Sequence, residues 1–244
     1  MLEVCVDSAE SAAAALEGGA DRLELCSALV VGGLSPSPAL FEAVRRRVPL
    51  PVRVMVRPRF GDFLYTRAEK EIMLEETREW RGRGAEGVVA GALLPDGRLD
   101  LPFLKDLREA SGGMRCTLHR AFDLCADPFA ALEEAVALGF DTVLTSGQRA
   151  SCREGAALIA ELVRRAAGRI EILAGSGVDA GAIRELRETA GCGSFHLSGK
   201  TVLESGMSFR RGGVPMGLPG LDEYSLWRTD AARVRAARAA LSGA

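Results

Sequence analysis

Short apolar runs alternate along the chain with longer segments whose apolar residues recur at helical spacing. Glycine stands at many joints between a helical segment and the next run, and glycine tolerates the left-handed conformation that ends a helix. These glycines are Gly19, Gly84, Gly139, Gly168 and Gly191. The apolar runs predict eight strands, near residues 2–7, 21–27, 51–58, 87–93, 114–121, 142–147, 169–175 and 194–199.

Polar and proline residues mark where the helices begin. A capping box pairs an N-cap side chain with a glutamate three residues later. Three pairs have this spacing: Asp7 with Glu10, Thr66 with Glu69, and Ser151 with Glu154. Pro36 and Pro128 fit a first helical turn, and Asp127 is the expected cap before Pro128. Each predicted strand is therefore followed by a helix.

Eight strand–helix units in 244 residues predict a single-domain (β/α)8 TIM barrel over residues 1–244. A doubly wound sheet usually needs fewer strands or a second domain. A final helix, near residues 222–241, closes the set. The Gly/Pro-rich residues between Met207 and Leu221 predict a loop after strand eight, at the end of the barrel where active sites form.

Composition narrows the class of protein. Apolar residues make up 48% of the chain and charged residues 26%, which is typical of a globular protein. Basic residues number 31 and acidic residues 33, with no basic stripe, so nucleic acid is not an expected partner. No apolar run reaches the roughly 18 residues of a membrane span and no leader pattern opens the chain, so we expect a cytoplasmic protein with reduced thiols.

Charged residues occupy strand positions that should face the inside of the barrel. The alternation of the strands points Glu3, Glu24, Arg57, His119 and His196 inward. Buried charges must pair or serve a ligand, so these residues form either a structural ion-pair network or a functional site. Groups near C-terminal strand ends favour function. Glu3 lies early in its strand and fits the structural interpretation, whereas Arg57, His119 and His196, together with Asp7, fit the functional one.

Two arginines leave the third strand on a proline-stiffened turn, Arg57-Pro58-Arg59. Guanidinium groups bind carboxylates and phosphates with two parallel hydrogen bonds, so Arg57 and Arg59 are candidates for holding an anionic substrate. Pairing with Asp62, Glu69 or Asp123 is the structural alternative, and the sequence leaves both open.

The turns after strands seven and eight suit an anion as well. Gly175-Ser176-Gly177 and Ser198-Gly199-Lys200 lie where many barrels bind a phosphate through backbone N–H groups. Such glycines are common at any tight turn, so the motif is weak. The chain contains no GxSxG, GxGxxG or GxxxxGK[ST] motif, which argues against a serine hydrolase, a dinucleotide enzyme and a P-loop enzyme.

Cys5 and Cys26 have inward positions on adjacent predicted strands. Two soft thiolates on neighbouring strands suit Cu(I), although buried cysteines also serve as small apolar residues. The remaining cysteines show no ligand spacing and are expected to pack or lie at the surface: Cys116, Cys125, Cys152 and Cys192.

Seven blocks of the chain, in order from residue 3 to about 200, resemble the CutC family of copper homeostasis proteins. They are Glu3-Val4-Cys5-Val6-Asp7-Ser8, Gly18-Gly19-Ala20-Asp21-Arg22-Leu23-Glu24-Leu25-Cys26-Ser27, Gly32-Gly33-Leu34-Ser35-Pro36-Ser37, Met55-Val56-Arg57-Pro58-Arg59-Phe60-Gly61-Asp62-Phe63, His119-Arg120-Ala121-Phe122-Asp123, Leu144-Thr145-Ser146-Gly147 and His196-Leu197-Ser198. The resemblance implies a TIM barrel, a cytoplasmic location, a homo-oligomer (a dimer or tetramer) and an association with copper, with Cys5 and Cys26 matching motif cysteines.

The chain departs from the family pattern at three positions. Leu118 replaces an aromatic residue before His119, Ser194 replaces an acidic residue before Phe195, and Ala182 replaces an asparagine after the strand-seven glycines. The last two lie at the expected mouth of the site, so we expect its electrostatics to differ from those of the family.

Two functions remain open. In the first, the protein handles copper and binds Cu(I) through Cys5 and Cys26. In the second, it is an enzyme that acts on a small carboxylate or phosphate compound at the barrel mouth, with His119 or His196 as general acid or base and Asp7 or Glu24 tuning it. The catalytic candidates are Asp7, Glu24, His119, Asp123 and His196, and the substrate-binding candidates are Arg57, Arg59, Ser146, Gly175, Gly177 and Ser198.

Overall fold

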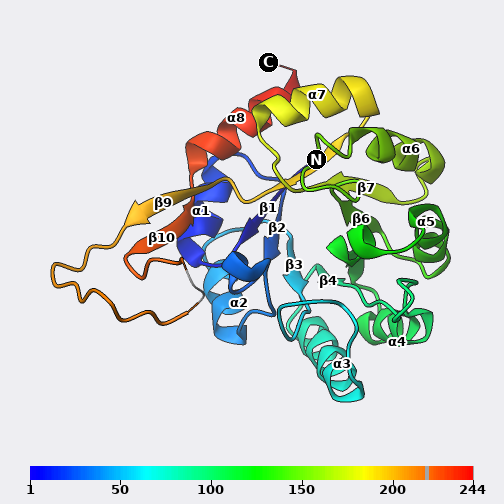
Figure 1. Ribbon diagram of the computed structural model, residues 1–244, viewed down its shortest axis with the longest axis horizontal. Helices are drawn as coiled ribbons and strands as arrows, with labels where there is room; N and C mark the ends of the chain where they lie inside the picture. Colours follow the sequence, from blue (N-terminus) through cyan, green and yellow to red (C-terminus); the bar gives the residue numbers. More distant parts are fainter. Residues whose placement is uncertain (218–219, 244) are drawn as a thin grey trace.

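Eight parallel strands close into a barrel in the computed structural model, which describes residues 1–217 and 220–243. Neighbours in sequence are neighbours in the barrel, and β1 pairs with β8 to close it (Figure 1). This confirms the predicted (β/α)8 fold. The strands are shorter than predicted: β1 Leu2–Val6, β2 Arg22–Leu25, β3 Val52–Met55, β4 Gly87–Ala90, β5 Arg115–Leu118, β6 Thr142–Thr145, β7 Glu171–Ala174 and β8 Ser194–Leu197.

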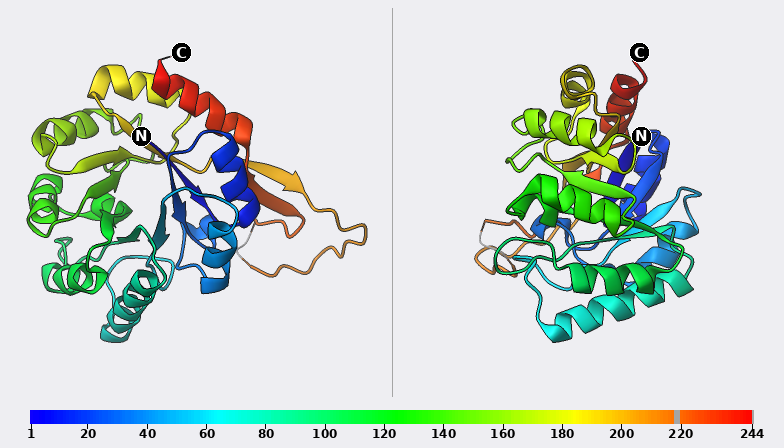
Figure 2. Two further views of the ribbon diagram at one scale, coloured as in Figure 1. Left: turned by 180° about the vertical axis from the view of Figure 1, so that it is seen from behind. Right: turned by 90° about the vertical axis from the view of Figure 1, so that its right-hand side faces the viewer.

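Helices surround the barrel, one after each strand, as the two further views show (Figure 2). They are α1 Ala9–Glu17, α2 Pro38–Arg45, α3 Arg67–Gly82, α4 Leu101–Ser111, α5 Pro128–Ala137, α6 Ala156–Ala166, α7 Ala180–Ala190 and α8 Ala231–Ser242, with short 3-10 helices η1 Leu29–Val31 and η2 Arg120–Leu124. Within the described residues, every helix is too short or too polar to cross a membrane.

Local sequence signals set most helix starts. The Thr66–Glu69 capping box of α3 and the Asp127 cap before Pro128 of α5 are confirmed. The starts of α1 and α2 were predicted slightly early. In both helices a serine farther along the chain supplies the cap. Ser8, not Asp7, caps α1, and Ser37 caps α2 with Pro38 in its first turn in place of Pro36. The Ser151 hydroxyl accepts from the backbone N–H of Glu154 as expected, but α6 begins only at Ala156.

The segment after β8 differs from the prediction. An antiparallel pair, β9 Lys200–Glu204 and β10 Ser225–Thr229, stands outside the barrel ring (Figure 1). The predicted helix at 222–241 is therefore a strand followed by a shorter helix. Residues 225–229 pair with β9, and the Asp230 side chain caps the start of α8. The predicted loop at 207–221 has no helix or strand among its described residues, and residues 218–219 lie outside them.

The apolar core lies between the barrel and the helices. Alternate strand residues such as Leu2, Val4, Leu23 and Leu25 are fully buried there, as the alternation predicted. The other half of each strand faces the barrel interior, where polar side chains replace the usual branched apolar ones.

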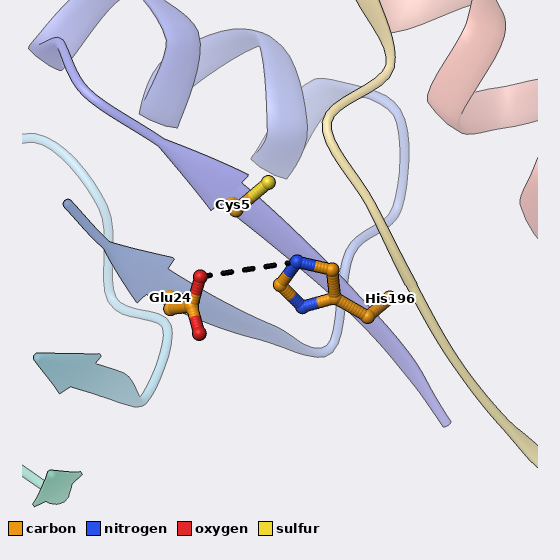
Figure 3. A group of neighbouring side chains, drawn as sticks. All are labelled: Cys5, Glu24 and His196. Atoms are coloured by element: carbon orange, nitrogen blue, oxygen red, sulfur yellow. Dashed lines mark ion pairs between the residues drawn. The ribbon is translucent and has the colours of Figure 1, made fainter. Parts of the chain in front are cut away.

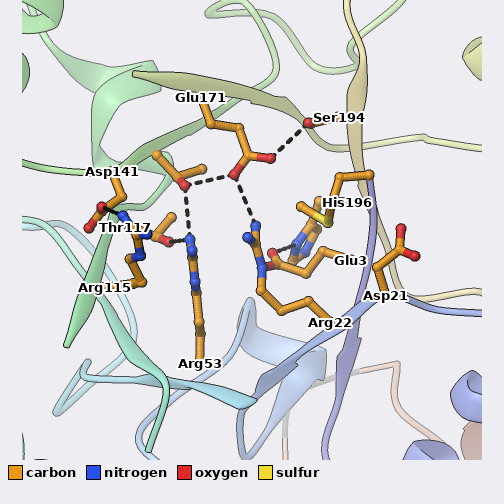
Figure 4. A network of polar contacts seen from close by, with 12 residues as sticks. Glu3, Asp21, Arg22, Arg53, Arg115, Thr117, Asp141, Glu171, Ser194 and His196 are labelled. Carbon is orange, nitrogen blue, oxygen red and sulfur yellow. Dashed lines mark hydrogen bonds and ion pairs between the residues drawn. The ribbon is translucent and has the colours of Figure 1, made fainter. Parts of the chain in front are cut away.

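A chain of buried polar contacts fills one end of the barrel interior (Figure 4). Glu3 accepts from Arg22 Nε at 2.5 Å, and Arg22 Nη2 lies 3.2 Å from Glu171 Oε2. Glu171 in turn accepts from Thr142 at 2.8 Å and from Ser194 at 2.7 Å. Both of these carboxylates, Glu3 and Glu171, are therefore paired with a cation or a hydroxyl donor, which offsets the cost of burying them.

Arg53 extends this network toward β4. Its Nη1 donates to the hydroxyls of Thr117 and Thr142, each at 2.8 Å, and its Nε lies 2.9 Å from Glu86 Oε2. Arg53 was not among the predicted inward residues, although the alternation that points Arg57 inward also points Arg53 inward.

We predict that Arg53→Met destabilises the fold by about 3 kcal/mol, because it leaves Glu86 and two hydroxyls without their cation. Urea unfolding at pH 7 measures the change. Arg115→Met is the matched control, since Arg115 is exposed and pairs with Asp141 near the surface. It should change the unfolding midpoint little. Equal losses in the two variants would contradict a structural role for the interior network.

Candidate functional site

A cavity of about 1040 Å³ opens at the C-terminal mouth of the barrel. Its floor comes from strand residues Cys5, Glu24 and His196 and from His119, the residue directly after β5. Its rim comes from the turns after β7 and β8 and from the first turns of α7 and α8. The predicted mouth of the barrel is thus a real cavity, and four of the inward polar residues face it.

His196 on β8 is held by Glu3 on β1, since the two strands pair with these residues side by side. The Nδ1 atom of His196 lies 2.7 Å from Glu3 Oε1. Burial opposes the charge of Glu3, but His196 and Arg22 outweigh it and lower the pKa of Glu3 to about 2. Burial also opposes the charge of His196, but Cys5, Glu24 and Glu3 together raise its pKa well above 6.5. The pair is therefore a buried imidazolium–carboxylate pair whose Nε2 is free for other partners.

Glu24 and Cys5 face the Nε2 side of His196 (Figure 3). Glu24 Oε2 lies 3.8 Å from His196 Nε2, and Glu24 Oε1 is buried without a hydrogen-bond partner in the described chain. Burial, followed by the charge of Glu3, raises the pKa of Glu24. Ligand atoms of Cys5, Glu24 and His196 lie within 4.8 Å of one another, so the three can hold one ion.

Cys26 has the inward position that the alternation predicted, but it is enclosed. It is fully buried in a small cluster with Met55 and Val89 and does not line the cavity. Its thiol donates to Glu24 Oε2 at 3.3 Å, and burial raises the pKa of that thiol well above 9.0. The group whose ligand atoms lie together is Cys5 with Glu24 and His196. All six cysteines are free and buried, which fits the expected reduced thiols.

His119 has the opposite charge state to His196. Its Nδ1 accepts from the backbone N–H of Ala121 at 3.2 Å, and its Nε2 is buried without a partner within the described residues. Burial, helped by the charge of Arg57, lowers the pKa of His119 to about 3. The ring is neutral at pH 7, which argues against the expected role of His119 as a general acid.

The two arginines of the Arg57-Pro58-Arg59 turn separate. Arg57 lines the cavity and donates to the carbonyl oxygens of Val31, Gly33 and Gly61. Arg59 does not line it. Arg59 pairs with Asp62 at 3.0 Å and with Glu69 at 2.6 Å, so the structural alternative holds for Arg59.

Asp123 and Ser146 organise a loop. The Asp123 carboxylate accepts from the Ser146 backbone, the Ser146 hydroxyl and the Thr145 hydroxyl, and it pairs with Arg120 at 2.7 Å. Asp123 borders the cavity, but its oxygens are occupied by these donors. Ser146 does not line the cavity, because its hydroxyl is used by Asp123 and by the carbonyl oxygen of Arg149.

The other predicted positions divide in the same way. Gly177 and Ser198 line the cavity, whereas Asp7 and Gly175 do not. Glu3, which fitted the structural interpretation, also raises the pKa of His196, together with Glu24, which was predicted for this role. Strand order decides this, because β1 pairs with β8 and sets Glu3 opposite His196.

Two rim cations were not among the predicted site residues. Lys200 and Arg233 both line the cavity, and Arg233 donates to the carbonyl oxygen of Lys200 at 3.0 Å. Lys200 is the last residue of the predicted turn Ser198-Gly199-Lys200, so the sequence already indicated its place beside the site. Arg233 belongs to an Ala/Arg-rich helix with several similar arginines, and only the fold distinguishes it.

Comparison with known proteins agrees with the resemblance seen in the motifs. The CutC family model matches residues 1–201. The chain belongs to the CutC family. A family protein CutC from Chromobacterium violaceum is 44% identical over 244 residues, which cover all of this chain and 99% of that protein. A human copper homeostasis protein cutC homolog is 45% identical over 236 residues, covering 96% of this chain and 86% of that protein.

A crystal structure of CutC from Streptococcus agalactiae has the same barrel. It superposes with a TM-score of 0.75 at 28% identity and covers 81% of this chain and 98% of that chain. This CutC-family protein is therefore a TIM barrel whose relatives carry the name of copper homeostasis. Its cytoplasmic location and its assembly as a homo-oligomer stay predictions.

We predict that Glu3→Gln destabilises this CutC-family protein by on the order of 3 kcal/mol at pH 7. The folded-state pKa of Glu3 lies below its usual 4.5, so its contribution is present above pH 4.5 and is lost as the pH falls toward about 2. The stability difference between wild type and variant should therefore shrink over that range. Urea unfolding at several pH values measures it.

Glu133→Gln is the control for that series. Glu133 pairs with Arg169 at the surface, so its loss should leave stability nearly unchanged at every pH. A difference between wild type and Glu3→Gln that stays constant from pH 7 to pH 2.5 would show that the pairing of Glu3 does not lower its pKa.

Proposed function

We propose that this protein is an enzyme that acts on a small anionic substrate at the C-terminal mouth of its barrel. The observation that carries the proposal is the content of one cavity. Glu24 and His196, which can transfer protons, lie at its floor, and Lys200 and Arg233, which form no ion pair among the described residues, lie at its rim. A protein that only carried an ion would have no use for this combination.

The floor supports acid–base chemistry. His196 carries its proton on the cavity side because Glu3 stabilises the imidazolium from the other side. Burial raises the pKa of Glu24, and its Oε1 has no partner in the described chain, so this carboxyl group is suited to exchanging a proton with a substrate. In this assignment His196 donates a proton to the substrate, Glu24 accepts or returns one, and Glu3 holds the imidazole ring in position.

The rim supports anion binding. Lys200 Nζ lies 3.5 Å from the centre of the Trp227 ring and Arg233 contacts a backbone carbonyl, and neither forms an ion pair in the described chain. The backbone of the Ser176–Gly177 turn and the first turn of α7 border the same space. Two cations without counter-ions beside exposed backbone N–H groups favour a carboxylate or a phosphate.

We predict that the double variant Lys200→Ala with Arg233→Ala binds propylphosphonate at least about tenfold more weakly than wild type. Titration calorimetry at low salt measures the affinity. Arg235→Ala is the matched control, because Arg235 lies on the same helix and pairs with Glu17 away from the cavity. Equal affinities in the double variant and wild type would contradict anion binding at this rim.

One observation favours a second function, the binding of Cu(I). The sulfur of Cys5, a nitrogen of His196 and an oxygen of Glu24 lie within 4.8 Å of one another at the cavity floor. Thiolate and imidazole suit Cu(I), whereas a carboxylate is a harder ligand, so two of the three donors fit this ion well. We propose Cys5 and His196 as the ligands, with the ion reaching them through the cavity.

An anaerobic Cu(I) competition titration tests this second function. Cys5→Ser should lower the Cu(I) affinity at least about tenfold, and Cys26→Ser should leave it near that of wild type, because Cys26 is enclosed away from the cavity. Equal losses of Cu(I) affinity in both variants would favour the pair predicted from the sequence, Cys5 and Cys26, as the ligands. Weak binding by wild type itself would remove copper from the functions of this chain.

A further inference from the structure

His119 lines the cavity and carries a single hydrogen-bond donor. Its Nδ1 accepts the Ala121 N–H, so the proton of the neutral ring must lie on Nε2. The residue is 3% exposed, and its Nε2 has no partner in the described part of the chain. A buried N–H without an acceptor is costly, and in a residue that lines a cavity a ligand oxygen can remove that cost.

The surroundings fix the plane and the position of this ring. The Phe63 ring lies 4.7 Å from the His119 ring, centre to centre. On the other side, a Cβ placed on Gly91 would lie 2.7 Å from His119 Nδ1, so only glycine leaves room for the imidazole. His119 also caps η2 through the same Nδ1. The donor is therefore held in one orientation before any ligand arrives.

Arg57 supplies a positive charge beside this donor. Its guanidinium is 5.0 Å from the centre of the Phe63 ring, on which His119 also packs, and three backbone carbonyls hold it. Arg57 has no carboxylate partner among the described residues, and its Nε is buried without an acceptor. Its charge is thus not cancelled locally, which favours negative charge at the cavity floor.

We infer that His119 Nε2 and Arg57 bind the carbonyl oxygen of the substrate, so that the substrates are small aldehydes or ketones that carry a carboxylate or phosphate group. This inference rests on the proposed function, which places the anionic group at the Lys200–Arg233 rim. A neutral, desolvated N–H suits a neutral carbonyl oxygen, and the neighbouring charge stabilises that oxygen as it becomes negative during reaction. The charged group of the substrate needs the cations of the rim instead.

Two phosphonates of equal chain length, compared at a pH at which both are dianions, test the inference. 2-Oxopropylphosphonate has the carbonyl group and propylphosphonate lacks it. Wild type should bind the oxo compound at least about tenfold more tightly in titration calorimetry, because without the carbonyl the donor stays unpaired. His119→Gln, which restores an N–H near the Nε2 position, should keep most of this preference.

His119→Asn is the decisive variant, because its side-chain oxygen can still accept the Ala121 N–H while the Nε2 donor is gone. It should lose most of the preference for the oxo compound, because only the charge of Arg57 then remains beside the carbonyl oxygen, and it should keep the propylphosphonate affinity of wild type. Thermal unfolding of each variant checks that it folds. A preference in His119→Asn as large as in wild type, or no preference in wild type, overturns the inference and leaves anion binding intact.

Nitrogen NMR gives a readout independent of ligand. The chain has two histidines, so long-range proton–nitrogen spectra of histidine-labelled protein resolve both rings. We expect His119 to be neutral and protonated on Nε2 at pH 7. An imidazolium or an Nδ1-protonated ring at His119 overturns the inference. If neither phosphonate binds to wild type, the proposed anion site fails, and the inference that rests on it fails too.

Discussion

The pairing of Glu3 with two cations is the constraint on which the rest of the site depends. One carboxylate oxygen contacts Arg22 and the other contacts His196, and the residue is completely buried. A carboxylate in that position is tolerated only because both oxygens are paired. Glu3 therefore joins the structural network of Arg22, Glu171 and Arg53 to the functional floor. A change to the interior charges also changes the charge state of His196.

This coupling gives the two histidines of one cavity different chemistry. His196 has a carboxylate behind it and is charged, whereas His119 has a backbone N–H and Arg57 near it and is neutral. When their environments push the pKa values of two titratable groups apart, the two groups commonly have different roles in an active site. His196 can give up a proton, and His119 can only donate a hydrogen bond. A single structural network would have no reason to separate them in this way.

The fold was predictable from the chain because local signals and strand alternation agree. Helix-ending glycines, the Thr66 capping box and the apolar face of each strand all specify the same eight units. The site was predictable only in part. Alternation identified Glu24, His119 and His196, since it depends on one strand at a time. Pairing between distant residues was not: Glu3 meets His196 only when the barrel closes, and Arg59 meets Glu69 only after its turn folds back onto α3. Residues 225–229 were predicted as helix because no strand was predicted at β9, with which they pair.

The two proposed functions, copper binding and acid–base catalysis, depend on the same atom, His196 Nε2. His196 Nε2 faces both Cys5 and Glu24, and it is the position where the imidazolium carries its cavity-side proton. A metal ion bound there would need the lone pair that holds this proton, so ion and proton exclude each other. Glu3 serves both states, because a carboxylate behind a histidine orients it equally well for a metal or for proton transfer. With both proposals taken together, a Cu(I) ion bound at the floor would switch off the proposed acid–base chemistry of His196.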